Sequence, residues 1–188
     1  MKIRALVRRR TAVAVASLAL LGSLAAAAPT AAAPTAAGPG DAYAARIDLA
    51  RARAATARYL YEPFAIADGY IRGGDDECVA VPGLGAMGIH YVNPQRLGHL
   101  DPTRPDILLY AQGPNGRRQL VGVEFFSADT DGNLGTDGDR PSLFGRPFDG
   151  PMPGHFPGQP VHYDLHVWLW RHNPAGMFAP FNPRLSCG

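Results

Sequence analysis

The sequence predicts an α+β fold, in which an N-terminal helix packs on a mainly antiparallel sheet of about four strands. Residues 41–61 contain neither glycine nor proline and are rich in alanine, arginine and leucine. Several apolar segments separated by Gly- and Pro-containing turns follow, and the last, 161–170, alternates strictly between two kinds of side chain. A helical part followed by strands is typical of α+β domains. Whether the sheet stays open or closes towards a barrel is left open.

The helical part comes first. Residues 41–61 are expected to form one helix, with Asp41 as its N-cap. Pro63 should end or kink this helix, because proline disrupts a helix interior. Residues 64–70 are expected to form a second short helix, with Gly69 near its end.

Four strands are expected after the helices. Their ranges are 87–92, 106–111, 119–127 and 161–170. The second and third should pair as a hairpin, since the turn residues Gly113-Pro-Asn-Gly116 lie between them. Residues 128–159 are rich in Asp, Gly and Pro and are expected to form a long loop.

The N-terminus is typical of an exported protein. Five of the first ten residues are basic, an apolar run covers 11–24, and small residues follow. We therefore expect a signal peptide at 1–33, a linker at 34–42 and a single globular domain at 43–188. The predicted location is secreted or extracellular, with no membrane anchor after signal removal. The choice between the Sec and twin-arginine routes stays open.

The charge of the domain argues against a nucleic-acid partner. The chain has 18 basic and 16 acidic residues. Without the five basic residues at the N-terminus, 13 basic and 16 acidic residues remain, a net charge of −3. No basic stripe survives that could follow a phosphate backbone.

Two cysteines, Cys78 and Cys187, are the only ones in the chain. An even number of cysteines in an exported protein predicts a disulfide. The bridge would join the segment after the helices to the C-terminus, and it would leave no thiol for catalysis.

Alternation places a set of polar side chains on one face of the sheet. In three of the expected strands, apolar residues occupy one parity and should pack under the helix. The opposite parity carries the candidate metal ligands, which are His90, Glu124, His162, Asp164 and His166. Imidazole and carboxylate groups converging from several strands predict a divalent metal site, with Zn, Fe, Mn or Cu as candidates.

Strand geometry limits which of these residues can share an ion. His162 and His166 are four positions apart, about 13 Å along a regular strand, so they can hardly bind the same ion. Asp164 is expected to be either a ligand or the acceptor that orients an imidazole. His155 lies on a loop that could swing over the same face. The competing interpretation is a half-buried face of hydrogen-bonded His and Asp residues without metal.

Several blocks of the chain resemble those of a family of small exported bacterial proteins, common in actinobacteria, that has no established activity. The resemblance covers nearly the whole domain and rests on residues 54–59, 87–94, 120–124, 148–155 and 160–170, including His90-Tyr-Val-Asn-Pro94 and Pro160-Val-His-Tyr-Asp-Leu-His-Val-Trp-Leu-Trp170. It implies a single exported domain and supplies no catalytic residue.

Two functional classes follow from the sequence. One is a metal-binding protein, with an enzyme such as a cupin-like oxygenase or a metal-dependent hydrolase as one form of it. The other is a non-catalytic cell-envelope module that binds a small molecule or an envelope partner through Trp168, Trp170 and the Pro/Gly-rich loop. The chain has no Gly-x-Ser-x-Gly motif, which argues against a serine hydrolase. The substrate and the oligomeric state are not predicted.

Overall fold

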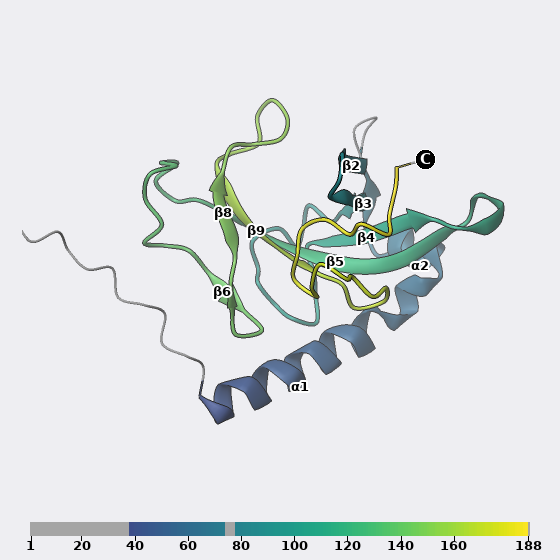
Figure 1. Cartoon of the computed structure of the whole chain (residues 1–188), viewed down its shortest axis with the longest axis horizontal. Helices are drawn as coiled ribbons and strands as arrows, with labels where there is room; N and C mark the ends of the chain where they lie inside the picture. The colour runs from purple at the N-terminus through teal and green to yellow at the C-terminus, as the bar shows by residue number, and fades with distance from the viewer. Residues whose placement is uncertain (1–37, 74–77, 188) are drawn as a thin grey trace, which may run out of the picture. The chain divides into compact units, whose positions relative to one another are not determined.

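The computed structural model describes residues 38–73 and 78–187, and it contains a helical part followed by a sheet (Figure 1). The helices are α1 (Pro39–Thr56), η1 (Ala57–Leu60), α2 (Glu62–Ala67) and the single turn η2 (Pro114–Gly116). The strands are β1 (Ile71–Arg72), β2 (Cys78–Val81), β3 (Gly85–Val92), β4 (Ile107–Gln112), β5 (Arg118–Ala128), β6 (Ser142–Leu143), β7 (Arg146–Pro147), β8 (Asp149–Met152) and β9 (His162–Val167).

The main sheet is antiparallel and, within the described residues, has seven strands. Its order is β1-β3-β4-β5-β9-β8, and β2 also pairs with β3. Strands β6 and β7 form a separate two-stranded sheet. The predicted α+β class is confirmed. The expectation of about four strands was wrong, and the barrel alternative was wrong too, because β1 and β8 lie at opposite ends of the strand order.

The additional strands are short and were hidden by their composition. β8 lies within the segment that was expected to be loop, and it contains Gly150 and Pro151. Both residues weaken a strand interior, and proline cannot donate a ladder hydrogen bond, so they are tolerated on edge strands. β8 is such an edge strand, since it pairs with β9 alone.

Helix α1 begins earlier than expected. Its N-cap is Gly38, and Pro39 takes the first helical position, where a missing N–H costs nothing. Asp41 is therefore not the N-cap. Its Oδ2 instead accepts a hydrogen bond from the Gly38 backbone N–H over 3.1 Å, which stabilises the first turn. The predicted signal peptide lies outside the described residues, so it stays a prediction together with the linker and domain boundaries.

One face of the sheet packs under the helical part. The core there contains Ala52 of α1, Tyr59 of η1 and the apolar parity of the strands, including Tyr91, Val123 and Leu165. Tyr110 donates a hydrogen bond to the Tyr59 carbonyl over 2.7 Å, which joins β4 to η1. The apolar side chains thus face the helices, as the alternation predicted.

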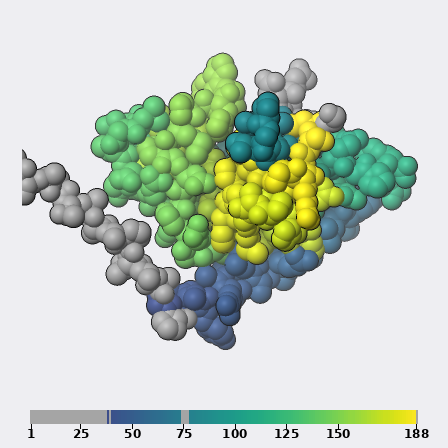
Figure 2. Space-filling view, in the orientation of Figure 1, coloured from purple at the N-terminus to yellow at the C-terminus, as the bar shows by residue number. Residues whose placement is uncertain are grey.

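The other face is partly covered by the C-terminal segment. Leu185 packs in a second core with Ile107, Leu109 and Val121, and Figure 2 shows this segment lying over the middle of the molecule. Cys78 and Cys187 form a disulfide with a Cα–Cα distance of 5.7 Å, which confirms the predicted pair and ties β2 to the end of the chain.

A β-bulge changes the parity of β5. Leu109 pairs with Gly122, but the next residue of β4 pairs with Leu120, so Val121 is the extra residue. Strict alternation over the expected strand 119–127 would place Val121 and Val123 on the same face, whereas the structure places Val121 in the second core. Gly122 is required here, because an added Cβ would lie 2.8 Å from the Val167 carbonyl oxygen.

The last strand ends before the two tryptophans. β9 stops at Val167, so the chain leaves the strict alternation that was expected to extend to residue 170. Trp168 is buried and donates to the Ala179 carbonyl over 2.6 Å. Trp170 packs against the helical side instead, where its ring lies 4.2 Å below the Arg53 guanidinium.

In the part of the chain that the structure describes, no helix is long and apolar enough to cross a membrane.

Candidate metal centre

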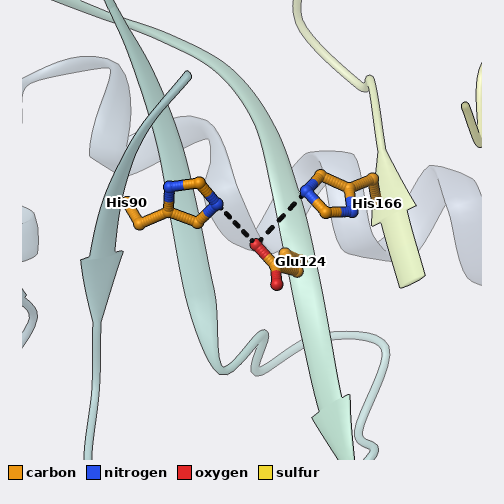
Figure 3. A group of neighbouring side chains, drawn as sticks. All are labelled: His90, Glu124 and His166. Carbon is orange, nitrogen blue, oxygen red and sulfur yellow. Dashed lines mark ion pairs between the residues drawn. The ribbon is translucent and has the colours of Figure 1, made fainter. Parts of the chain in front are cut away.

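Three strands bring His90, Glu124 and His166 together on the face opposite the helices (Figure 3). Glu124 on β5 pairs directly with His166 on β9. On its other side Glu124 pairs with Ile107 of β4, and His90 pairs with Leu109 of the same strand. The His90 ring therefore reaches diagonally over β4 to meet Glu124.

Both imidazoles turn the same ring nitrogen towards one carboxylate oxygen. The Nε2 atom of His90 lies 3.1 Å from Oε2 of Glu124, and Nε2 of His166 lies 3.5 Å from the same oxygen. All three donor atoms lie within 4.8 Å of one another. Figure 3 shows the two rings on either side of the carboxylate.

These groups are buried without the hydrogen bonds that burial normally requires. Among the described residues, Oε2 of Glu124 and both ring nitrogens of His166 have no partner with hydrogen-bond geometry, despite the short distances. Buried polar atoms are usually hydrogen-bonded, and a buried carboxylate without compensation is costly. The contacts are therefore close but are not directed as N–H···O bonds.

The distances fit a shared ion. Around a tetrahedral ion with ligand bonds of about 2.1 Å, adjacent ligand atoms lie about 3.4 Å apart. The measured separations of 3.1 and 3.5 Å lie on either side of this value. Two imidazole nitrogens and one carboxylate oxygen also form a ligand set used by zinc and by non-haem iron. These three side chains could therefore hold a divalent metal ion.

Neighbouring charges shift the pKa values of Glu124 and His166. Burial alone would raise the pKa of Glu124, but the positive charges of His166 and His90 outweigh burial and lower this pKa. Burial would lower the pKa of His166, but Glu124 and then Asp164 outweigh it and raise this pKa. Without an ion, the two pKa shifts favour an ionised Glu124 beside a protonated His166, and a metal ion bound at Nε2 would displace a proton from that ring.

Asp164 stands behind His166. Its Oδ1 lies 3.5 Å from Nδ1 of His166, on the opposite side of the ring from Glu124. A carboxylate at this position fixes the tautomer and the orientation of a metal-binding imidazole. Asp164 therefore lies where the orienting acceptor was expected, but the 3.5 Å contact does not have hydrogen-bond geometry.

His162 does not join His90 and Glu124. The structure places its ring with Asp164 and His155 in a neighbouring group, whose donor atoms also lie within 4.8 Å of one another. His162 and His166 therefore belong to different groups, as expected for residues four positions apart on one strand. Of the five residues singled out in the sequence, three form the first group, and His162 and Asp164 belong to the second.

The sequence analysis did not count three acidic or basic residues near these groups among the candidate ligands. His155 was expected on a loop that could swing over this face, and its ring centre lies 5.0 Å from that of His162. Asp149 pairs with Asp164 across β8 and β9, and no strand was expected there. Asp106 is fully buried immediately before β4, and burial together with the charge of Glu124 raises its pKa to about 7. Only its place as the first residue of a predicted strand could have drawn attention to it.

Comparison with known proteins adds no relative. No protein family, curated protein or solved structure matches this chain.

Proposed function

We propose that this protein binds a divalent metal ion through His90, Glu124 and His166. One observation carries the proposal: a buried carboxylate oxygen lies 3.1 and 3.5 Å from two imidazole Nε2 atoms without a hydrogen bond to either. In a site without metal, the imidazole N–H groups would be expected to point at the oxygen. Donor atoms that converge at ligand distances instead leave room for a positive ion between them.

The ligand set restricts the ion to a few candidates. Two imidazoles and a carboxylate suit Zn²⁺, Fe²⁺, Mn²⁺ or Cu²⁺, whereas Ca²⁺ and Mg²⁺ prefer oxygen ligands alone. With three protein ligands, a fourth position remains for water or a small molecule, as in catalytic zinc sites. This open position would allow metal-assisted chemistry, or the reversible binding of a small anionic ligand.

The approach to the open position would lie beside His90. Its side chain is 18% exposed, against 8% for Glu124 and 1% for His166. A small molecule would therefore meet the ion from the β3 side and not through β9. The predicted signal peptide and the Cys78–Cys187 disulfide support the proposal that this takes place outside the cytoplasm.

Metal analysis tests this function. The protein is produced in medium supplemented with zinc, iron, manganese and copper, and its metal content is measured by mass spectrometry after gel filtration. His166→Ala and Glu124→Gln should each lose one equivalent of metal. His172→Ala removes an exposed histidine outside both groups and should leave the metal content unchanged. If Glu124→Gln and His166→Ala retain the full metal content of the parent, the proposed site is wrong.

A further inference from the structure

The neighbouring group of His155, His162 and Asp164 has its own ligand geometry. Each residue places one donor atom within 4.8 Å of the other two. His162 and Asp164 come from β9, and His155 comes from the loop between β8 and β9. None of the three is needed to place an ion between His90, Glu124 and His166.

His162 is held with one ring nitrogen available. Its Nδ1 lies 3.1 Å from the Pro160 carbonyl oxygen, which can only accept, so Nδ1 carries the proton. The neutral ring then keeps a lone pair on Nε2. Phe126 stacks on the buried ring with a centroid distance of 5.1 Å, which fixes the plane of the imidazole. A hydrogen bond from the far nitrogen and a fixed ring plane are typical of metal-binding histidines.

Asp164 is buried and incompletely bonded. Within the described residues, its Oδ1 has no hydrogen-bond partner, and its neighbour Asp149 adds negative charge from β8. A buried carboxylate is stabilised when positive charge lies close to it. The His166 imidazole lies near Asp164 with one ring nitrogen and near Glu124 with the other, so the two carboxylates share the charge of one ring.

The loop holds His155 beside this pair. The His155 backbone N–H donates to Oε1 of Gln159 over 2.7 Å, and the Gln159 N–H donates to the Phe156 carbonyl over 3.1 Å. A Cβ on Gly154 would lie 2.2 Å from the Gln159 carbonyl oxygen, so only glycine permits this tight turn. The exposed His155 ring therefore lies over His162 because the loop closes there.

We propose that His155, His162 and Asp164 form a second divalent-cation site, separate from the one at His90, Glu124 and His166. Its two imidazoles and one carboxylate select the same class of borderline metal ions. The second site shares no ligand with the first. Asp164 also faces the His166 ring, so an ion at one site would lower the affinity of the other site by electrostatic repulsion. Because His155 is exposed and lies on a loop, the second ion should exchange faster and bind more weakly than the first.

Titration of the purified, metal-free protein with Zn²⁺ in a calorimeter tests this. The parent should bind two ions per chain, His155→Ala one, and the double variant His90→Ala/His155→Ala none. His155 is exposed, so its replacement should leave the fold intact, which circular dichroism checks. His172→Ala, the control for binding at a surface histidine, should still bind two.

The two proposals fail in different ways. If the parent binds one ion and His155→Ala also binds one, the second site does not exist while the first stands. If the parent binds two ions and both His155→Ala and the double variant His90→Ala/His155→Ala bind one, the second site stands and the first is wrong. A parent that binds no Zn²⁺ overturns both.

Discussion

Nδ1 of His166 lies 3.5 Å from Oδ1 of Asp164, two positions earlier on the same face of β9. The period of two along a strand places both side chains on one face. This relationship joins the two groups of candidate ligands. His166 turns its other nitrogen to Glu124, and Asp164 belongs to the group with His155 and His162.

Asp164→Asn should therefore affect both sites. It removes the carboxylate that faces Nδ1 of His166, and loss of such a partner behind a metal-binding imidazole typically lowers metal affinity by about 10–100-fold. It also removes a ligand of the second site, so one equivalent of Zn²⁺ should be lost. Competition titration against a chromophoric chelator measures both effects. Asp48→Asn, which removes a carboxylate from α1 on the other side of the sheet, should change neither. Unchanged affinity and stoichiometry in Asp164→Asn would argue against its role.

Metal binding should stabilise the fold. An ion that binds only the folded chain at 100 times its dissociation constant adds about 2.7 kcal/mol to the free energy of unfolding. For a domain of this size, that raises the melting temperature by several degrees. Differential scanning calorimetry with and without Zn²⁺ measures the shift. Glu124→Gln should lose most of it and His172→Ala none. An equal shift in all three proteins would indicate that Zn²⁺ acts elsewhere.

Asp106 should make stability depend on pH. Burial and the charge of Glu124 raise its pKa from 3.8 to about 7 in the folded chain. Between these values the folded chain holds a proton that the unfolded chain releases, so stability falls as pH rises from about 4 to 7. The shift of about three units corresponds to roughly 4 kcal/mol at most. Asp106→Asn should remove this fall in the free energy of unfolding. Urea unfolding of the metal-free parent and variant at pH 4 and pH 8 measures the difference.

A second aspartate provides a control of opposite sign. The pKa of Asp101 is lowered because the backbone N–H of Thr103 donates to its carboxylate over 2.8 Å. Its contribution to stability is present above its unfolded pKa and is lost as pH falls through the folded pKa. Asp101→Asn should therefore be destabilising at pH 8 and less so in acid.

The Asp106 prediction is contradicted if the difference in unfolding free energy between Asp106→Asn and the parent is the same at pH 4 and pH 8. Asp106 would then ionise normally in the folded chain.

The disulfide should contribute to stability but not to metal binding. Cys78 and Cys187 are 109 positions apart, and loss of a bridge that closes a loop of this length costs about 2–5 kcal/mol. The double variant Cys78→Ser/Cys187→Ser should unfold at lower urea concentration while it binds as many ions as the parent. The same urea midpoint in both proteins would show that the bridge adds nothing. A changed stoichiometry would instead connect the bridge to the ligands.

The sequence predicted the face of the site because alternation holds in β3, in β9 and in the part of β5 that follows its bulge. Tyr91, Val123 and Leu165 pack towards the helices, which leaves the opposite parity to His90, Glu124 and His166. The prediction needed no knowledge of strand order. It holds because one slip of register would bury charged groups under the helix.

The remaining features depend on tertiary structure that local patterns do not encode. The bulge that redirects Val121 arises from the pairing of β4 with β5. β8 forms because its backbone pairs with the free edge of β9, although Gly150 and Pro151 disfavour a strand. The position of His155 follows from that strand and from a loop closed by Gln159, so it could not be read from spacing along the chain.

The central claim is tested most directly by diffraction from crystals of the metal-loaded protein at the absorption edge of the bound metal. We predict an anomalous-difference peak about 2.0–2.2 Å from Nε2 of His90, Nε2 of His166 and a carboxylate oxygen of Glu124. A map from fully loaded crystals with no peak between these residues, and with the imidazole N–H groups donating to Glu124 instead, would contradict it.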